Sequence, residues 1–487
     1  MRGNLADLRF VEDLRRVVGD RGLITRPEQL RTYECDGLTN FRVVPAAVVL
    51  PSDAKQVQEI VRLCDRDNVP FVARGSGTGL SGGALPVEGG VVISLARLTR
   101  ILEVDIPNAR VVVEPGVINS NVTAAVAPYG YFYAPDPSSQ SVCTIGGNVA
   151  ENSGGAHCLK YGFTTTHVLG LEVVLPDGSL VHLGGRTLDT PGYDLCGVVV
   201  GSEGTLGIAT KVILHITRRP EVIETLLAAF NSIDDTGAAV SAIIAAGIVP
   251  AAAEIMDRLS MKATFAAVKH NYPDCEGLLL VELDGPREEV DELVRQVRDL
   301  CTKCGAFEIR VAKTEAERLA VWKGRKAAFA SMGRISPNYI VQDGVIPRTK
   351  LPQVLREISR MSAEAGLRVA NVFHAGDGNL HPLVLYDRRI AGQEHRAEEL
   401  AAAILKLCVR AGGSITGEHG VGVEKRDFMC EMFSEPDLDT MRRVRIAFDP
   451  KGLSNPMKLF PRPRLCAERQ GPYVPHPLET AGVAEFF

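Results

Sequence analysis

Two histidines flank a glycine-rich turn in the segment 371–382, which reads NVFHAGDGNLHP. Apolar residues typical of strands lie on both sides, and Asp377-Gly378 at its centre is a dipeptide typical of two-residue β-hairpin turns. With that turn, residue 376 pairs with 379, 375 with 380 and 374 with 381. His374 and His381 are then directly opposite, with Cβ atoms roughly 4.5–5.5 Å apart. Two imidazoles so placed can bind one metal ion, and a metal site is the prediction for this hairpin.

A third ligand is available in a second glycine-rich segment, 412–422, which reads GGSITGEHGVG. It places an acid and a base side by side, at Glu418 and His419. A simple turn between two helices would not require this pair. Two imidazoles and a carboxylate form a mixed nitrogen and oxygen ligand set that suits zinc, manganese or iron.

Three further stretches of small residues, all in the first half of the chain, predict a bound anion. They run from Gly75 to Gly83, from Ile145 to Gly155 and from Gly201 to Ile208. Glycines leave backbone N–H groups unshielded, so such loops can surround phosphate oxygens. The spacing matches neither a Walker loop nor the usual dinucleotide fingerprint. A flexible surface loop is the alternative for one stretch alone, but three together predict a long cofactor.

The elements that must position these residues follow from the hydrophobic pattern. A strand at Ala46–Leu50, a helix that ends near Arg66 and a strand at Phe71–Ala73 lead into the first glycine-rich loop. A hairpin with Asp177-Gly178 at its turn is expected at 169–183. Beyond Arg218–Pro220, longer amphipathic helices alternate with strands. This pattern predicts an α+β second domain with a mostly antiparallel sheet.

Size and composition exclude several classes of protein. With 487 residues the chain exceeds one ordinary domain, and its net charge of -5 with interspersed Lys and Arg argues against a nucleic-acid partner. The apolar runs are strand-length, so we expect no membrane span. The N-terminal segment has the pattern of a short amphipathic helix, and not that of a secretion or transit signal. The 11 cysteines are scattered, with no group of four that could ligate an iron–sulfur cluster.

Together, the three glycine-rich loops resemble the FAD-binding domain of the vanillyl-alcohol oxidase superfamily, also called the PCMH-type flavin domain. Relatives that attach flavin covalently use a His or Cys. The first loop has no His, and the nearby His157 and Cys158 are better explained as ordinary loop residues, so the resemblance implies non-covalent FAD. It implies that FAD contacts Arg74, Gly75, Ser76, Gly77, Thr78, Gly79, Ser81, Gly82, Pro137, Ser138, Thr144, Gly146, Gly147, Asn152, Ser153, Gly154, Glu203, Gly204, Ile208 and Asn455.

The second half resembles the FAD-linked oxidase C-terminal domain of D-lactate, D-2-hydroxyglutarate and glycolate dehydrogenases. The HAGDGNLHP and GEHGVG motifs, the segment 322–329 and the segment 448–456 carry this resemblance. The stretches 33–38, 134–140 and 370–383 look like the FAD-linked D subunits of bacterial glycolate oxidase, of the FAD-binding oxidoreductase/transferase type 4 family. The implied fold is α+β: an N-terminal helical segment (1–41), a two-lobed PCMH-type FAD-binding domain (42–219), a substrate and metal domain (220–460) and an extended tail (461–487).

The resemblance also implies roles for site residues. His374, His381 and Glu418 would bind a divalent metal, His419 would be the catalytic base, and Arg325 would bind the substrate carboxylate. Dicarboxylate-specific relatives carry a Lys in the strand occupied here by 340–342, and an Asn where this chain has Leu383. Both departures favour a short substrate, glycolate or D-lactate, over 2-hydroxyglutarate.

The implied partners are a second flavin-type subunit and an iron–sulfur subunit, because the electrons of the reduced flavin need an acceptor. We expect a cytoplasmic protein held at the inner face of the membrane through those subunits. Three alternatives stay open. They are a stand-alone dehydrogenase that reduces a quinone or soluble acceptor, a non-catalytic flavoprotein of an assembly, and a metal-dependent hydrolase, which would leave the glycine-rich loops unexplained.

Overall fold

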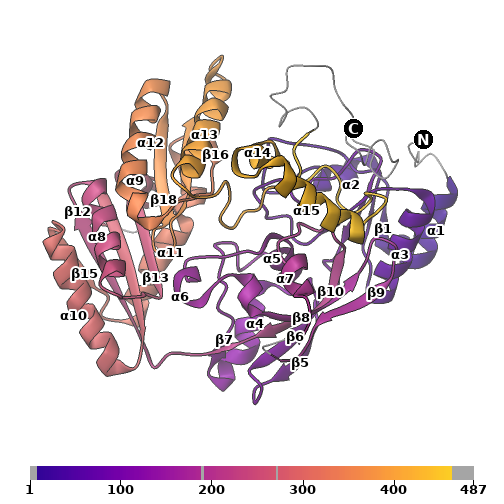
Figure 1. The fold of residues 1–487 in the computed structure, drawn as a ribbon, viewed down its shortest axis with the longest axis horizontal. Helices are drawn as coiled ribbons and strands as arrows, with labels where there is room; N and C mark the ends of the chain where they lie inside the picture. Colours follow the sequence, from indigo (N-terminus) through magenta and orange to yellow (C-terminus); the bar gives the residue numbers. More distant parts are fainter. Residues whose placement is uncertain (1–7, 188–190, 270–271, 463–487) are drawn as a thin grey trace. The chain divides into compact units, whose positions relative to one another are not determined.

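A computed structural model describes residues 8–187, 191–269 and 272–462. The chain forms two compact units (Figure 1), and each consists of more than one chain segment. The first unit holds the chain up to Gly154, Phe163–Arg218 and the segment from Glu418 onward, and the second holds Gly155–Gly162 and Arg219–Gly417.

This division differs from the consecutive domains expected from the sequence. The chain from Glu418 returns to the first unit and does not stay with residues 220–417. The reason is a specific attachment: Ser454 forms a parallel bridge with Phe71, and Leu453 is buried in the core of the first sheet. The expected tail, 461–487, lies almost entirely outside the described residues.

The first sheet of the first unit has the order β1-β2-β4-β3, with β1 (Leu23–Ile24), β2 (Ala47–Val49), β3 (Phe71–Arg74) and β4 (Val91–Ser94). Strands β2, β4 and β3 are parallel, because the helix α3 (Ala54–Asp67) crosses over between β2 and β3. The Asp53 side chain caps α3 by accepting from the N–H of Gln56 at 2.9 Å. The predicted strand–helix–strand unit is therefore confirmed.

The second sheet is antiparallel, in the order β5-β6-β10-β8-β9. Its strands are β5 (Ile101–Asp105), β6 (Arg110–Val113), β8 (Val168–Val174), β9 (Leu180–Gly184) and β10 (Ile208–His215). The predicted hairpin over 169–183 is β8 and β9, which confirms it. A short pair, β7 (Tyr131–Phe132) and β11 (Thr217–Arg218), accompanies it. The remaining helices of this unit are α1 (Leu8–Val18), α2 (Pro27–Leu30), α4 (Asn119–Val126), α5 (Ile145–Glu151), α7 (Leu195–Val199), α14 (Met429–Met432) and α15 (Glu435–Phe448).

The second unit is built on an antiparallel sheet, as predicted. Its path is β15-β12-β14-β13-β18-β19-β17, and β20 joins β18 to β16. The strands are β12 (Val222–Phe230), β13 (Ala252–Asp257), β14 (Gly277–Gly285), β15 (Glu308–Val311), β16 (Asn338–Val341), β17 (Gly344–Val345), β18 (Arg368–His374), β19 (Asn379–Leu380) and β20 (Pro382–Tyr386). The helices are α6 (Cys158–Tyr161), α8 (Ile233–Ala245), α9 (Arg258–Val268), α10 (Arg287–Lys303), α11 (Glu315–Ser331), α12 (Leu351–Ala365) and α13 (Gln393–Arg410).

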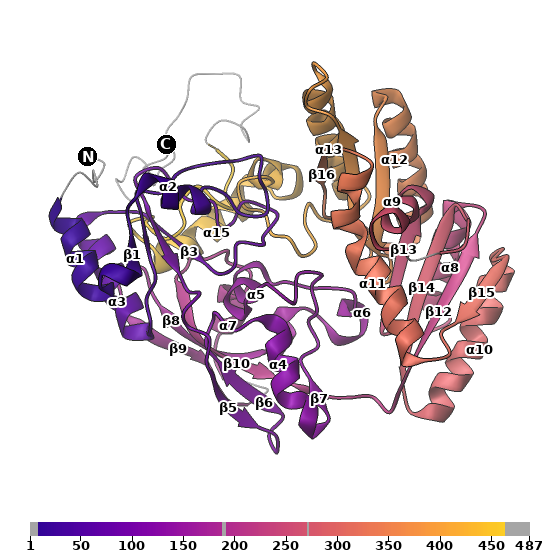
Figure 2. The same ribbon diagram turned by 180° about the vertical axis from the view of Figure 1, so that it is seen from behind.

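Helices cover both faces of this sheet. One core joins the sheet to α8, α10, α12 and α13, which Figure 1 shows in front of the strands. The other core joins it to α9 and α11, which face the viewer in Figure 2. Strand β14 is therefore buried on both faces, and successive residues alternate between the two cores. No helix in the described part of the chain is long and apolar enough to cross a membrane.

Candidate active site

The histidine hairpin forms, but its register differs from the prediction. His374 pairs with Asn379 and not with His381, and Asn371 pairs with Pro382, so Ala375–Gly378 make a four-residue turn. The predicted two-residue turn needs positive φ at both Asp377 and Gly378, and only Gly378, with φ 82°, adopts it. The Asp377 carboxylate accepts from the N–H of Asn379 at 3.1 Å and stabilises the wider turn.

The shift in register keeps the two histidines on one face of the sheet. The shift amounts to two residues. Because side chains on a strand alternate between the two faces of the sheet, a shift of two residues leaves each side chain on its original face. His374 and His381 become diagonal neighbours, with ring centroids 5.1 Å apart and planes at 83°. Both side chains are buried. They lie on the sheet face covered by α9 and α11, because their strand neighbours Val372 and Leu383 pack in that core.

Glu254 on β13 is a site residue that the sequence prediction missed. It pairs directly with His374 across β13 and β18, and its Oε1 lies 2.7 Å from Nδ1 of His374. Burial alone would raise the pKa of this carboxyl, but the charges of Arg325 and His374 lower it, so Glu254 is ionised. A carboxylate bound to one ring nitrogen fixes the tautomer and directs the other nitrogen toward a metal. The signal in the sequence was an acid within the apolar strand AAAEIMD.

Arg325 lies on α11 and is 2% exposed. Its Nη2 is 2.5 Å from Oε2 of Glu254, which is fully buried. One carboxylate therefore contacts both the metal-ligand candidate His374 and the predicted substrate-binding arginine. The buried Nε of Arg325 has no hydrogen-bond partner among the described residues. A guanidinium held in this way retains donor capacity for a second carboxylate.

Asp343, which follows β16, is a second acid that the prediction missed. It is completely buried, and its Oδ1 is 3.4 Å from Nε2 of His381. Its Oδ2 accepts from the hydroxyl of Thr416 at 2.6 Å and from the N–H of Gly417 at 3.0 Å. Asp343 thus joins the histidine hairpin to the end of the 412–417 segment.

The 412–417 segment packs closely on the hairpin. Ser414 bridges Val345, and a Cβ at position 417 would lie 2.5 Å from the side-chain amide of Asn379, so only glycine fits there. Glu418 follows Gly417 directly, and a trans peptide bond holds their Cα atoms about 3.8 Å apart. Glu418 and His419 open the segment assigned to the first unit, and their place beside the histidines remains a prediction.

Within the first unit, Glu203 holds the backbone that follows His419. Its buried carboxylate accepts from the N–H of Val421 at 2.6 Å and from the N–H of Gly422 at 2.7 Å. Burial raises the pKa of Glu203 to about 6, and the two backbone N–H groups oppose this rise. The predicted contact of Glu203 with FAD stays a prediction, and its carboxylate binds backbone N–H groups of the GEHGVG loop.

The first glycine-rich loop has the property required of an anion site. It follows β3, and the N–H groups from Ser76 to Gly83 donate no hydrogen bond within the part of the chain that the structure describes. Ser81, Gly82 and Gly83 are nonetheless buried. Buried N–H groups without partners are costly, so the loop fits a ligand with phosphate oxygens.

The other predicted cofactor residues lie around this loop and the two loops that follow. Arg74 is buried and donates to the carbonyl of Cys35 at 2.8 Å, while Thr144 caps α5. Asn455 donates to the carbonyls of Gly83 at 2.8 Å and Glu203 at 2.6 Å, which ties the C-terminal segment to two of the loops. The direct contacts of these residues with FAD remain predictions. Of the rest, Gly146 and Gly147 lie in α5, Asn152, Ser153 and Gly154 follow it, Gly204 precedes β10, Ile208 begins β10, and Pro137 and Ser138 lie before α5.

His157 and Cys158 belong to the short segment that joins the second unit. Nε2 of His157 lies 3.0 Å from the Glu282 carboxylate, and the Cys158 side chain is buried. The structure thus gives His157 a partner within the protein.

The donor set of the second unit suits a divalent ion. Two buried imidazoles face one another, one is oriented by the Glu254 carboxylate, and a second carboxylate, Asp343, lies beside the other. Nitrogen and oxygen donors of this kind are those that zinc, manganese and iron accept.

Comparison with known proteins identifies two FAD-related domains in this chain. Residues 45–184 match an FAD binding domain, and residues 219–459 match the FAD linked oxidases, C-terminal domain. The glycolate oxidase subunit GlcD of Escherichia coli (strain K12) is 49% identical over 95% of this chain and 93% of its own length. The D-lactate dehydrogenase of Anaerostipes hadrus is 33% identical over 85% of this chain and 89% of its own length.

Among solved structures, p-cresol methylhydroxylase with bound substrate superposes with a TM-score of 0.78, covering 93% of this chain and 96% of the other at 18% identity. That likeness confirms the predicted PCMH-type fold, and the sequence relatives confirm the predicted resemblance. The chain therefore belongs to the FAD-linked oxidases and is an FAD-dependent oxidoreductase related to glycolate oxidase subunits and D-lactate dehydrogenases.

Proposed function

We propose that this protein oxidises glycolate to glyoxylate, with D-lactate as a second substrate, using non-covalent FAD and a divalent metal. The observation that carries the proposal is the buried chain of contacts from Arg325 through Glu254 to His374 and His381. Arg325, on α11, thus packs against the sheet face that carries His374 and His381, which supports a shared site for the substrate carboxylate and a metal. The higher identity to a glycolate oxidase subunit than to a D-lactate dehydrogenase, 49% against 33%, supports glycolate as the first choice.

Each residue has a defined part in this chemistry. Arg325 would bind the substrate carboxylate through guanidinium donors that Glu254 leaves available. His374, His381 and Glu418 would hold a zinc, manganese or iron ion, which lowers the pKa of an alcohol bound to it. His419 would take the proton of the 2-hydroxyl near neutral pH, and bound FAD would supply the oxidising power for the substrate.

Two positions in the second unit support a short monocarboxylic acid. Leu383 is completely buried in the apolar core beside α11, and Gln342 is 4% exposed. Leu383 stands where dicarboxylate-specific relatives are expected to carry Asn, and Gln342 belongs to the segment 340–342 in which they are expected to carry Lys. An apolar and a neutral side chain here provide no charge to bind a second carboxylate.

The physiological electron acceptor is proposed to be a partner protein. The Escherichia coli relative is named as a subunit of glycolate oxidase. We infer a similar assembly here, with a second flavin-type subunit and an iron–sulfur subunit that hold the protein at the inner face of the membrane. A stand-alone dehydrogenase that reduces a quinone is the alternative, and steady-state turnover with quinone alone would favour it.

The test is anaerobic reduction of the protein-bound flavin. We expect glycolate to bleach the oxidised-flavin absorbance faster than D-lactate, and D-2-hydroxyglutarate to have little effect. Removal of metal by a chelator, or the His419→Ala substitution, should abolish bleaching while flavin content stays unchanged. His395→Ala is the matched control, because the side chain of His395 on α13 is 75% exposed and His395 is not a candidate site residue.

Two outcomes would contradict the proposal. Flavin that none of the three acids reduces would favour the non-catalytic assembly flavoprotein. Full bleaching after complete metal removal would exclude the metal-assisted mechanism and leave only the flavin chemistry. Separately, denaturation that releases all the flavin would support non-covalent attachment, whereas flavin that remains with the polypeptide would contradict it.

A further inference from the structure

The segment Gly155–Gly162, called the inserted segment below, belongs to the second unit, although the chain on both sides of it belongs to the first. Its two ends are held together within the first unit. The hydroxyl of Thr164 donates to the carbonyl of Ser153 at 2.7 Å, and the N–H of Thr165 donates to the side chain of Asn152 at 2.9 Å. The inserted segment is therefore a loop with a fixed base. That base contains two residues of the second glycine-rich loop for which contact with FAD is predicted.

Two buried acids of β14 bind the inserted segment in the second unit. Nε2 of His157 lies 3.0 Å from the Glu282 carboxylate. Lys160 donates to the carbonyl of Asp284 at 2.8 Å and also to its carboxylate, which accepts from the hydroxyl of Tyr161 at 2.5 Å. The two acids are only 2% and 8% exposed. Hydrogen bonds to an ionised partner are stronger than neutral ones, so this attachment holds the segment firmly on the sheet.

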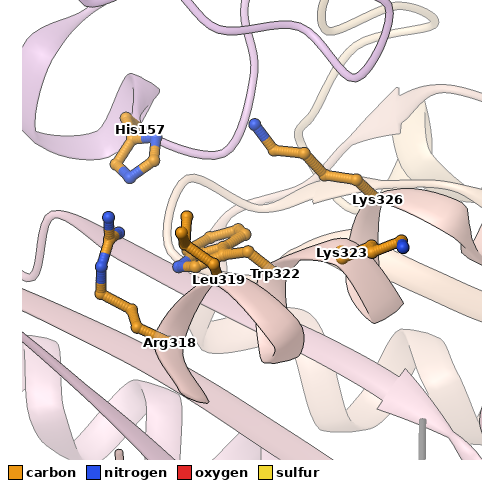
Figure 3. Close-up of a pocket in the computed structure, with 6 residues that line it drawn as sticks. All are labelled: His157, Arg318, Leu319, Trp322, Lys323 and Lys326. Atoms are coloured by element: carbon orange, nitrogen blue, oxygen red, sulfur yellow. The ribbon is translucent and has the colours of Figure 1, made fainter. Parts of the chain in front are cut away.

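Glu282 also holds the helix that carries Arg325. It accepts from Nε1 of Trp322 at 2.5 Å and from Nη1 of Arg318 at 3.2 Å. Figure 3 shows His157 reaching from the inserted segment toward both of these side chains of α11, and the rings of His157 and Trp322 are 5.4 Å apart. Arg325 follows Trp322 by three residues, less than one turn of the helix. One carboxylate thus joins the inserted segment to the helix of the predicted substrate-binding arginine.

The inserted segment also packs on the turn of the histidine hairpin. Gly376, two residues after His374, lies so close to Leu159 that a Cβ at position 376 would be 2.8 Å from Cδ2 of the leucine. The N–H of Gly376 donates to the carbonyl of Ala253 on β13 at 3.1 Å, which fixes the turn on the sheet. Because protein interiors are close-packed, a displacement of this turn is passed on to Leu159. The inserted segment therefore contacts the hairpin of the candidate metal ligands as well as α11.

We propose that the inserted segment is a positioning element, which sets the end of the flavin loop, residues 152–154, by its attachment to the histidine hairpin and α11. Glu282, Asp284 and Leu159 are then positioning residues, because they act through this segment. Such an element matters because the rate of a reaction between two bound groups depends steeply on their placement, and a shift of about 1 Å can cost about 100-fold. The proposal rests on the predicted contact of residues 152–154 with FAD, and not on the identity of the substrate or the metal.

The test changes the histidine hairpin and reads the flavin. Gly376→Ala places a methyl group against Leu159 and should speed the release of FAD from the holoprotein by about tenfold and change the visible circular dichroism of the bound flavin. The double variant Gly376→Ala/Leu159→Ala removes the clash, because the nearest remaining contacts of that methyl group are 3.4 Å to Ala253 and 3.5 Å to Cβ of residue 159. It should restore both signals. Neither measurement needs substrate or metal, so the result does not depend on the oxidation of glycolate.

A second variant loosens the attachment without adding bulk. Asp284→Asn removes the charge that binds Lys160 and should change both flavin signals in the same direction as Gly376→Ala. Glu276→Gln, at an exposed acid directly before β14, is the matched control and should leave them as in the parent. Two results would overturn the proposal. One is a flavin signature like that of the parent in both Gly376→Ala and Asp284→Asn, even if their unfolding free energy falls. The other is a double variant that fails to recover the signals lost in Gly376→Ala.

Discussion

The carboxylate of Glu254 lies 2.7 Å from Nδ1 of His374, although the two residues are 120 positions apart in the chain. They face one another on the neighbouring strands β13 and β18. The same carboxylate holds Arg325 through its second oxygen. A single buried acid therefore couples the candidate metal ligands to the candidate substrate-binding group, and it is the natural first target for substitution.

Glu254→Gln should weaken metal binding about 10- to 100-fold, because an amide orients His374 less strongly and leaves Arg325 without its counterion. The measurement is metal retained after dialysis against a series of chelator concentrations. Glu276→Gln, at an exposed acid next to β14, is the control and should bind metal as the parent does. Parent-like metal retention in Glu254→Gln would remove Glu254 from the site.

Two substitutions distinguish the roles of Arg325. Arg325→Lys keeps a positive charge beside Glu254 but loses the planar fork, so KM for glycolate should rise by about tenfold or more while the fold persists. Arg325→Met leaves the buried Glu254 carboxylate without its guanidinium partner and should lower the free energy of unfolding by about 3–5 kcal/mol. Steady-state kinetics and urea unfolding measure the two effects. An unchanged KM in Arg325→Lys would mean that this arginine only neutralises Glu254.

Glu203 and Glu151 are two acids of the first unit whose pKa values are both raised by burial, so the same substitution can be compared at both positions. Burial, together with the neighbouring Glu203 and Asp36, raises the pKa of Glu151 well above its usual value and so favours the neutral form of this carboxyl. Glu151→Gln should therefore change the free energy of unfolding by less than about 1 kcal/mol.

Glu203, with its pKa of about 6, is ionised at pH 8 and accepts two backbone N–H groups of the GEHGVG loop. Glu203→Gln loses the charge and one of these bonds, at a cost of about 1–3 kcal/mol, and should lower kcat with little change in flavin content. Urea unfolding and anaerobic flavin reduction at pH 8 compare the two variants. Equal effects of both substitutions would contradict a specific role for Glu203.

Asp257 predicts a pH dependence of stability. It is the N-cap of α9 and also accepts from the backbone of Asn371 at 2.6 Å, and burial raises its pKa from 3.8 to about 6. Between these values the native protein holds a proton that the unfolded chain has lost. The contribution of Asp257 to stability is therefore fully present below pH 4 and is lost as pH rises through 6, by about 3 kcal/mol at most.

The check is the difference in unfolding free energy between the parent and Asp257→Asn, measured from pH 4 to pH 8. The advantage of the parent should fall across pH 4–6 and stay level above pH 7. A difference that does not vary with pH would show that Asp257 is ionised throughout this range.

Local signals predicted the elements well where one pattern dominates. The helix α3 begins at its Asp53 cap, and the β8–β9 hairpin turns at Asp177-Gly178. The prediction that His374 and His381 share one face of the hairpin is correct, but the predicted strand pairing is wrong by two residues, because His374 pairs with Asn379 and not with His381. Turn type depends on whether Asp377 adopts positive φ, which its identity permits but does not require.

The sequence by itself determined the helices and strands, the α+β class, the glycine-rich loops and the placement of His374 and His381 on one face of a hairpin. These features depend on residues near one another in the chain. Only the tertiary structure decided that Glu254 supports His374, that Asp343 joins His381 to Gly417, and that the segment from Glu418 returns to the first unit. A buried acid in an apolar strand is stable only when a distant strand or helix supplies its partner. The pairing of strands far apart in the chain selects that partner, and the spacing of residues within one segment carries no information about it.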